Sequence, residues 1–201
     1  MNAADRNADD VSENDAHVSD HALVARIQSG DRDAFDAMYT LYARRLVGFA
    51  YTYVRSSDTA QDIVANLFVH LWVDRARWEL QGALAPYLFA AVRRRALNYV
   101  RDQSRADRAL ALVQDDAGLV MGHLPGPFDV DTALDASARR AALRDVIAQL
   151  PPDRQRLVAL RWREGLTIPQ IAEVVGSNAK AVQQQLLRTI RALQKKLGQT
   201  P

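Results

Sequence analysis

The chain has 201 residues, of which 48% are hydrophobic, with 26 Lys and Arg against 24 Asp and Glu, which is enough apolar material for one large or two small globular domains. It contains no cysteine, so disulfides and thiolate metal sites are excluded, and its four histidines are scattered. No apolar run approaches the roughly 18 residues that cross a bilayer, and the polar amino terminus lacks a signal-peptide core, so we expect a cytoplasmic protein without membrane insertion.

The first 20 residues carry six carboxylates against Arg6 alone and few large apolar side chains. This composition is typical of a disordered segment, and an acidic tail is predicted over residues 1–19. A short helix is expected from about Asp20 to Ser29. Gly30 suits the left-handed position that ends it.

Three longer helices are predicted between Asp31 and residue 104. From Asp31 to Val54, large apolar residues recur at steps of three and four, the period of a helix with one buried face. The next helix is expected to be capped by Asp58, with Gln61 in the capping-box position. The third is expected over about Leu84 to Gln103, after the irregular stretch "DRARWELQG". These elements predict an all-α domain over residues 20–104.

The third of these helices has a basic stripe. Helical spacing places five residues on one face: Tyr87, Arg94, Asn98, Arg101 and Arg105. Guanidinium groups follow phosphates, and Tyr87 or Trp78 can stack on an unpaired base, so the stripe suits single-stranded nucleic acid. The alternative is that both aromatic residues belong to the core and that one of the arginines 93–95 pairs with Asp62 or Asp74.

The segment 105–137 is acidic and rich in Gly and Pro, as in "DDAGLVMGHLPGPFDVD". It has no sustained period, so we interpret it as a flexible acidic linker between domains. Beyond it the balance reverses, since residues 139–196 hold twelve Lys and Arg against four acidic residues. A unit with this charge favours a polyanionic partner.

Residues 138–201 predict a second, smaller helical domain. A helix is expected from the Pro-Pro start at residues 151–152 to Glu164, with Gly165 behind it. Thr167 and Gln170 form a capping box for a short helix to Val175. Gly176 then turns the chain, and Ser177 or Asn178 caps a last helix that runs to about Leu197. This spacing is that of a helix-turn-helix.

The last helix separates into two faces. Apolar residues gather on one side, namely Val182, Leu186, Ile190, Leu193 and Leu197, and polar residues on the other, namely Lys180, Gln184, Arg188, Arg191 and Lys195. Arg and Lys bond phosphates or guanine, Gln pairs with adenine, and the bordering Leu187 can meet a thymine methyl. The face therefore has the groups needed to read a major groove, although an ordinary solvated face has the same composition.

The two units, in this order, resemble the bacterial sigma factors of the extracytoplasmic-function (ECF) class. The segments "DAFDAMYTLYARRLVGFAYTYV", "AQDIVANLFVHLW" and "APYLFAAVRRRALNYVRDQSR" resemble the domain that melts promoters. "LRDVIAQLPPDRQRLVALRWREGLTIPQIAEVVGSNAKAVQQQLLRTIRAL" resembles the domain that reads the upstream promoter element. The resemblance implies a nonenzymatic subunit that binds core RNA polymerase, directs it to promoter DNA and holds the opened strand. It also implies an anti-sigma factor that masks these surfaces.

The resemblance assigns roles to individual residues. Asp62, Asn66 and Phe68 fall on the helix that docks on the polymerase, with core packing as the alternative for Phe68. The segment from Trp78 to Tyr87 falls beside the downstream element, where a base can be flipped into a pocket, and Arg94, Asn98 and Arg101 line the DNA. Ser177, Asn178, Lys180, Gln184 and Arg188 face the upstream element. No cofactor or metal site is expected.

This chain departs from the usual family pattern at several positions. Gln61 replaces a common Glu, Ala65 a common Gln, Arg94 a frequent Asn and Ala181 a common Thr. Polymerase affinity and promoter sequence therefore do not carry over from relatives.

Two other classes of protein compete with this interpretation. A helix-turn-helix regulator that acts without polymerase explains the basic carboxy-terminal unit, but it leaves the helix after Asp58 and the second basic stripe without a role. For a purely protein-binding helical adaptor, salt-insensitive behaviour and no affinity for nucleic acid would be expected. An enzyme is not expected, since the sequence has no phosphate-cradling glycine loop, no nucleophile elbow and no ligand cluster at metal spacing.

Overall fold

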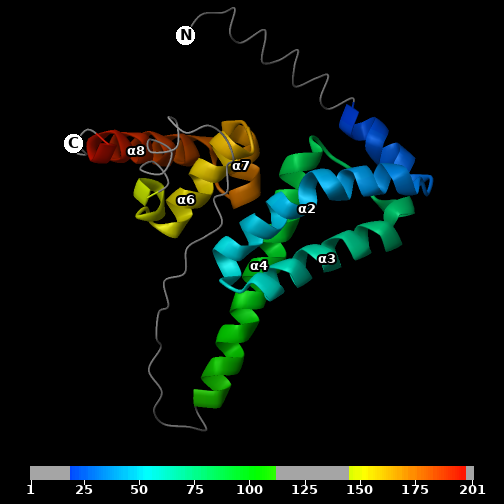
Figure 1. Cartoon of the computed structure of the whole chain (residues 1–201), viewed down its shortest axis with the longest axis horizontal. Helices are drawn as coiled ribbons and strands as arrows, with labels where there is room; N and C mark the ends of the chain where they lie inside the picture. Colours follow the sequence, from blue (N-terminus) through cyan, green and yellow to red (C-terminus); the bar gives the residue numbers. More distant parts are fainter. Residues whose placement is uncertain (1–18, 112–144, 198–201) are drawn as a thin grey trace, which may run out of the picture. The chain divides into compact units, whose positions relative to one another are not determined.

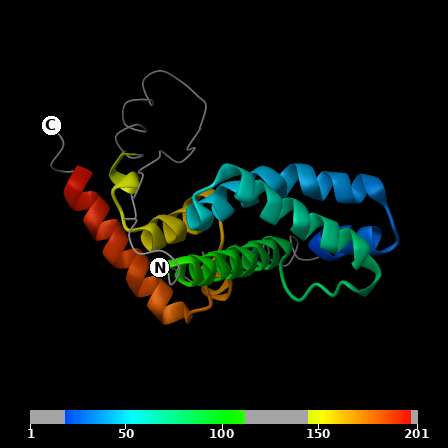
Figure 2. The ribbon, with the colours of Figure 1, turned by 90° about the horizontal axis from the view of Figure 1, so that it is seen from below.

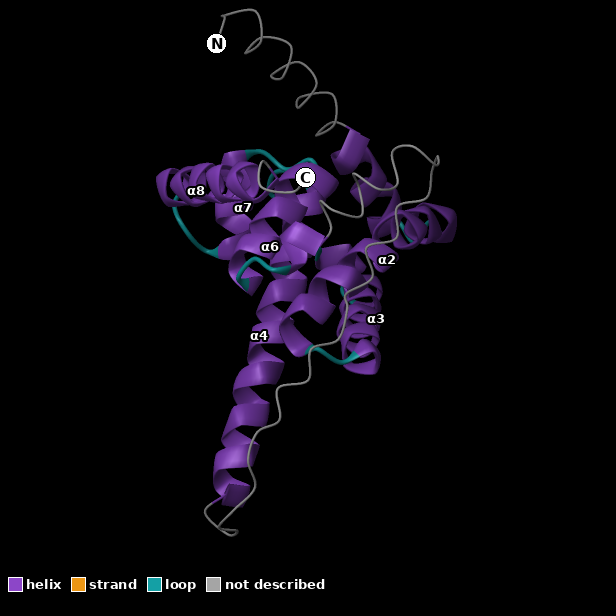
Figure 3. Cartoon of the chain, turned by 60° about the vertical axis from the view of Figure 1, so that its left-hand side comes forward, coloured by secondary structure: helices purple, strands orange, loops and turns teal. Residues whose placement is uncertain are grey.

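A computed structural model describes residues 19–111 and 145–197, and the side chains of 19–105 and 145–196 (Figure 1). The acidic tail predicted over residues 1–19 lies almost wholly outside the described residues, as does most of the predicted linker. The described part of the chain is helical and has no strand (Figure 3), as the all-α prediction requires. None of the helices in that part is long and apolar enough to cross a membrane. The chain divides into two compact units, Met1–Tyr99 and Val100–Pro201.

The N-terminal unit begins with a helix over residues 19–28 that turns sharply into the next. Gly30 has a φ of 90°, so the predicted left-handed position is confirmed. Asp31 then caps α2 (Arg32–Val54) by accepting from the amide of Ala34 at 3.0 Å. That bond, with the Arg26 guanidinium 2.7 Å away, lowers the pKa of the Asp31 carboxyl. The corner between the two helices is thus held by local contacts.

Helix α3 (Ser57–Val73) starts two residues earlier than predicted. Its cap is Ser56, whose hydroxyl accepts from the amide of Thr59, and the expectation that Asp58 caps it is wrong. The cause lies in the preceding residue, because Arg55 ends α2 with a φ of 58° and so brings Ser56 to the cap. Asp58 lies instead in the first turn, where a carboxylate stabilises the positive end of the helix dipole.

Helices α2 and α3 lie side by side and antiparallel (Figures 1 and 2). Together they bury an apolar face that includes Met38, Leu46, Val64 and Leu67. Burial of such side chains stabilises the fold by about 1.5–3 kcal/mol each.

The segment between α3 and α4 is fixed at both ends by the first helix. After the short 3-10 turn η1 (Arg75–Arg77), Gln28 donates to the carbonyl of Trp78. Six residues further on, the amide of Leu84 donates to the Asp20 carboxylate at 2.8 Å. Helix α4 runs over Leu84–Ala111, eight residues beyond the predicted end. Contacts distant in sequence therefore position the loop before α4.

The C-terminal unit begins, in its described part after α4, with a helical turn at residues 145–148, followed by α6 (Pro152–Val158). Gln155 closes the turn by donating to the carbonyls of Ala148 and Leu150 at 2.9 and 2.7 Å. The predicted continuous helix to Glu164 widens into a π-helical segment, η2 (Ala159–Arg163), before Gly165 ends it with a φ of 71°.

Helices α7 (Ile168–Val175) and α8 (Ala179–Leu197) form the predicted helix-turn-helix. The capping box is confirmed, because the amide of Thr167 donates to Gln170 at 2.9 Å and the amide of Gln170 donates back to the threonine hydroxyl. Gly176 makes the turn with a φ of 61°. Of the two predicted caps of α8, the structure uses Asn178, whose Oδ1 accepts from the amide of Ala181 at 2.8 Å.

Candidate nucleic-acid and polymerase interfaces

One face of helix α8 is exposed to solvent and carries basic and amide side chains. The helix contains five basic and no acidic residues. Every residue predicted to face an upstream element is exposed, namely Ser177, Asn178, Lys180, Gln184, Leu187, Arg188 and Arg191. The Asn178 Oδ1 is occupied by the helix cap, so only its amide group remains to contact a ligand.

The opposite face of α8 packs against α6 and α7. Val182 and Leu186 are buried as predicted, while Ile190 and Leu193 are half-buried. Thr189 was not predicted in this face, yet it is fully buried, and its hydroxyl is satisfied there by donating to the carbonyl of Gln185 at 2.7 Å. Packing therefore holds α8 with its basic side outward, in the orientation that groove reading requires.

Helix α4 carries the second basic stripe. Arg94, Asn98, Arg101 and Arg105 are all exposed, whereas Tyr87 is half-buried. Arg101 and Arg105 lie 3.8 and 3.7 Å from the Asp102 carboxylate, exposed contacts that bind weakly in water. The predicted alternative of an ion pair from one of the arginines 93–95 to Asp62 or Asp74 is not formed among the described residues. The basic members of the stripe are thus exposed to solvent along one face of α4.

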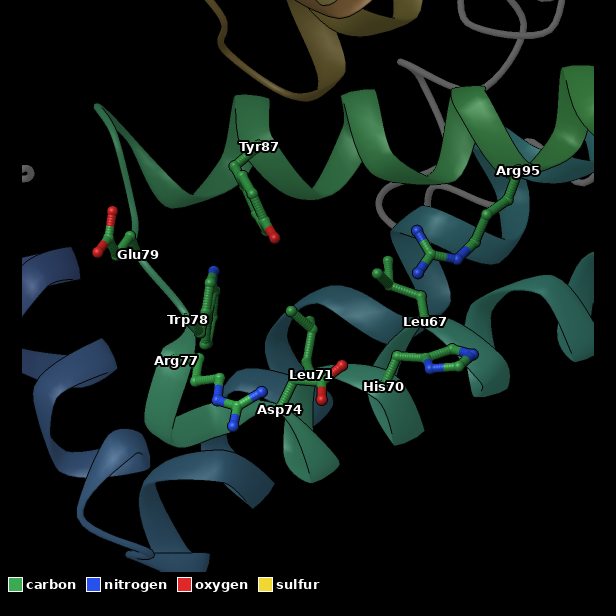
Figure 4. A pocket seen from close by; sticks show the side chains of 9 residues that line it. All are labelled: Leu67, His70, Leu71, Asp74, Arg77, Trp78, Glu79, Tyr87 and Arg95. Carbon is green, nitrogen blue, oxygen red and sulfur yellow. The ribbon is translucent and has the colours of Figure 1, made fainter.

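A hollow of about 260 Å³ lies between the end of α3, the loop after η1 and the start of α4 (Figure 4). Its lining comprises Leu67, His70, Leu71, Asp74, Arg77, Trp78, Glu79, Tyr87 and Arg95. The Trp78 and Tyr87 rings meet at one end, with centroids 5.7 Å apart and planes 34° apart. The predicted downstream residues Trp78 and Tyr87 therefore belong to one concave site.

The expectation that Trp78 offers a ring face to a base is wrong for this structure. Only 5% of the residue is exposed, because its ring packs against Tyr87 and its carbonyl is held by Gln28. Its indole Nε1 is buried and has no acceptor among the described residues. Trp78 is therefore a core residue at the edge of the hollow, as the alternative interpretation held, and not a stacking platform.

Arg95 is a lining residue of this hollow that the sequence did not single out. Figure 4 shows its side chain descending from α4 toward Leu67 and His70. Burial lowers the pKa of the guanidinium, while Tyr87 acts in the opposite direction. The helical period alone places residue 95 beside the buried face of α4, which was the signal that could have found it.

A further candidate surface lies on the exposed side of α3. Asp62 and Asn66 are exposed, as a docking role requires. Val69 and Val73 continue the same helical stripe and are 58% and 66% exposed. The sequence analysis missed both valines, because an apolar residue in a helix is ordinarily assigned to the core.

Phe68 does not belong to that exposed surface. It is buried, and its ring lies 5.9 Å from Phe35 and 4.9 Å from Tyr39, centroid to centroid. The assignment of Phe68 to polymerase contact is therefore corrected to packing between α2 and α3.

Two stretches of the chain match known protein families. Sigma-70 region 2 matches residues 38–106, and Sigma-70 region 4 matches residues 140–193, together more than half of the chain. The ECF RNA polymerase sigma-E factor of Haemophilus influenzae is 28% identical over 182 residues, which are 90% of this chain and 96% of that protein. The chain belongs to the extracytoplasmic-function sigma factors. The RNA polymerase sigma-H factor of Pseudomonas aeruginosa is similar to the same degree, 28% over 188 residues, covering 89% of this sigma factor and 93% of its own length.

The fold of this sigma factor is also similar to two solved structures. The sigma factor RpoE of Bartonella quintana, in complex with the anti-sigma factor NepR, aligns with a TM-score of 0.57 and 18% identity over 83% of this chain and 98% of its own. CnrH, in complex with the cytosolic domain of CnrY, aligns with a TM-score of 0.57 and 19% identity over 90% and 99%. At these identities the likeness concerns the fold, and it confirms the predicted all-α architecture with two helical domains.

The family matches contain all the candidate surfaces. The region 2 match holds the exposed side of α3, the hollow and the α4 stripe as far as Arg105, and the region 4 match holds the α8 face as far as Arg191. The predicted family and its order of domains are thus confirmed, whereas the roles of single residues remain predictions.

Proposed function

We propose that this sigma factor binds core RNA polymerase, brings it to promoters and stabilises the opened DNA. The observation that carries the proposal is the presence of two separate exposed basic faces, on α4 and α8, within Sigma-70 regions 2 and 4 of one chain. Cationic faces on two domains suit a ligand that is duplex at one position and unpaired at another.

The region 2 part takes two roles in this proposal. Asp62, Asn66, Val69 and Val73 dock on the polymerase through the exposed stripe of α3. Arg94, Asn98, Arg101 and Arg105 bind the phosphates of the opened strand, and the hollow beside Tyr87 and Trp78 receives an unpaired base. We assign this part to residues 20–104, the linker to 105–137 and the upstream-reading part to 138–201.

The region 4 part reads the upstream element through α8. Arg188 and Gln184 lie centrally on the exposed face, where a recognition helix meets base edges, while Lys180, Arg191 and the α8 cap at Asn178 lie near the phosphates. Ser177 precedes the helix, and Leu187 contacts a thymine methyl.

Regulation by an anti-sigma factor fits the same surfaces. Of the structural neighbours named above, RpoE was solved with the anti-sigma factor NepR and CnrH with the cytosolic domain of CnrY. Exposed apolar residues such as Val69, Val73 and Leu187 suit protein binding in the absence of polymerase. Sigma factors are transcription factors, and we propose that this one has no enzymatic activity and acts in the cytoplasm, where its DNA lies.

In vitro transcription from a genomic library, with core polymerase and the full chain, tests the proposal. New start sites that require the protein are expected. Gel shifts distinguish a sigma factor from a helix-turn-helix regulator that acts without polymerase. We expect the chain to bind promoter DNA weakly until core polymerase is added. Binding that is equally tight without polymerase would support the regulator, and no start sites on any template would overturn the proposal.

Changing Val73→Asp is expected to weaken binding to core polymerase by about tenfold or more, because a carboxylate is costly to bury against an apolar surface. Fluorescence titration of labelled protein with core polymerase measures the affinity. Leu41→Asp makes the same chemical change at an exposed position of α2, 56% accessible, and should bind within about twofold of wild type. Equal losses in the two variants would contradict a docking role for α3.

Changing Arg94→Ala is expected to slow promoter opening by about tenfold while leaving initial docking intact, since a charged hydrogen bond contributes about 1.5–3 kcal/mol and forms here only with the separated strand. A fluorescent base analogue in the melted region reports opening, and footprinting at low temperature reports docking. Arg32→Ala removes an exposed cation from α2 and should leave both unchanged. A loss of docking as large as the loss of opening would refute the assignment.

A further inference from the structure

The acidic tail, residues 1–19, has no role in the proposed function. It carries five carboxylates against Arg6 alone. Helix α4 has the reverse balance between Leu84 and Arg105, with five arginines against Asp102 alone. The two segments therefore have equal and opposite formal charge, and opposite charges on one chain attract.

The tail joins the described part of the chain at the start of α4. Directly after the tail, the carboxylate of Asp20 accepts from the amide of Leu84 at 2.8 Å (Figure 2). Gln28, on the same first helix, donates to the carbonyl of Trp78 in the segment before α4. These two bonds hold the attachment point of the tail beside the end of α4 from which the basic stripe extends.

The length of the tail matches the position of the basic stripe. At a rise of about 1.5 Å per residue, Arg94 and Arg105 lie about 15 and 32 Å along α4 from Leu84. The sequence predicts disorder for the tail, and a disordered chain of 19 residues averages about 22–26 Å from end to end. The effective concentration of a tethered group is greatest where its average length matches the span. The tether therefore favours contact between the tail and the stripe.

The stripe presents exposed guanidinium groups. Arg94 is exposed, and the side chains of Arg101 and Arg105 are 59% and 69% exposed. Their contacts with the Asp102 carboxylate are long, at 3.8 and 3.7 Å, and lie in water, where one ion pair is weak. Carboxylates of the tail can compete with such contacts. Because each pair is weak, several must form together, which a tether makes possible.

We propose that in the free chain the acidic tail lies along the basic stripe of α4 and shields it from single-stranded nucleic acid. Carboxylates and phosphates both offer charged oxygen acceptors to guanidinium groups, so the tail and the nucleic acid exclude each other. The contact does not depend on the proposed function, whereas its consequence for promoter DNA rests on it. A tail that covers the stripe for nine-tenths of the time weakens DNA binding there about tenfold.

A spin label on the tail tests the contact. The chain contains no cysteine, so a nitroxide on Ser12→Cys is the only label in the full-length protein. In nuclear magnetic resonance spectra it should broaden the amide signals of residues 94–105 on α4, and those of residues 180–191 on α8 much less. Raising the salt from about 0.1 to 1 M shortens the Debye length from about 10 to 3 Å and should restore the signals. Broadening mainly on α8, or on neither helix, would overturn the proposal.

Binding of a fluorescent oligothymidylate to the full chain, measured by anisotropy at low salt, tests the shielding. A neutral-tail variant replaces each tail carboxylate by the corresponding amide, namely Asp5→Asn, Asp9→Asn, Asp10→Asn, Glu13→Gln and Asp15→Asn. This variant should bind about tenfold more tightly than wild type, and the difference should shrink as the salt concentration rises. Equal affinity of the two proteins would refute shielding by the tail.

A stripe variant tests whether the tail acts through α4. It carries Arg94→Ala, Arg101→Ala and Arg105→Ala. Neutralising the tail in this background should change the affinity by less than about twofold, because the surface that the tail covers is gone. An equal gain in both backgrounds would mean that the tail acts through net charge or on another surface, and the proposal would be wrong.

The matched control neutralises the same number and kind of carboxylates at exposed positions outside the tail, namely Asp33→Asn, Asp36→Asn, Asp58→Asn, Asp145→Asn and Glu173→Gln. It should bind the oligonucleotide within about twofold of wild type, and a tenfold gain would contradict a specific role for the tail. Far-UV circular dichroism melts establish that each variant is folded, and the spin label carries the test should the stripe variant unfold. Absence of new start sites in the transcription experiment would instead refute the proposed function and leave the contact standing.

Discussion

Replacing Arg188 with glutamate is expected to reduce transcription from promoters that depend on an upstream element by about 100-fold. A bidentate contact from arginine to a base contributes about 1–3 kcal/mol, and the introduced carboxylate adds repulsion from the phosphates. Multi-round transcription with reconstituted polymerase measures the effect on two templates, one with an intact and one with a scrambled upstream sequence. The variant should transcribe the intact and the scrambled template at similar rates, whereas wild type should lose most of its activity on the scrambled template.

A charge reversal elsewhere on the same helix provides the control. Lys196 lies on another face of α8 and contacts Gln149, at 2.9 Å, so Lys196→Glu changes the net charge by the same amount without touching the reading face. It should keep the response to scrambling and lose only the salt-dependent part of binding. If the two reversals weaken transcription equally on both templates, α8 supplies general electrostatic attraction and Arg188 does not read sequence.

Features that depend on residues close together in sequence were predictable. The helical period separates the buried Val182 and Leu186 from the exposed Lys180 and Arg188 without knowledge of the tertiary fold. The capping box at Thr167 likewise follows from side chains three residues apart. The basic reading face, its orientation and the turn before it could therefore be derived from the chain alone.

Features set by distant contacts were not predictable. Trp78 is buried because Gln28, far away in the sequence, holds the loop after η1, and because Tyr87 of the following helix packs against its ring. Val69 is exposed and Phe68 buried because α3 presents one edge to α2, and the apolar pattern "NLFVHLWV" is compatible with several orientations. The hollow arises from three separated segments, so the sequence indicated the region but neither its shape nor Arg95.

The same long-range packing makes Phe89 a residue whose loss should strongly destabilise the N-terminal unit. Phe89 is fully buried, and its ring meets that of Phe49 edge-on, with centroids 5.1 Å apart. Truncation of a buried phenylalanine costs about 3–5 kcal/mol, including the loss of an aromatic pair. Against a typical unfolding free energy of about 5–15 kcal/mol, this is a large fraction. Phe89→Ala should therefore leave the N-terminal unit marginally stable.

Tryptophan fluorescence during urea unfolding measures this loss in one unit of the full chain. Of the three tryptophans, Trp72 and Trp78 lie in the N-terminal unit and Trp162 in the other, so a Trp162→Phe background reports on the N-terminal unit alone. In that background Phe89→Ala should strongly lower the urea concentration at which half of the N-terminal unit is unfolded. Phe89→Leu keeps most of the side-chain volume and should lower that concentration far less. An unchanged midpoint would mean that Phe89 does not anchor α4. The positions of Arg94 and Arg95 would then depend on contacts other than the aromatic core.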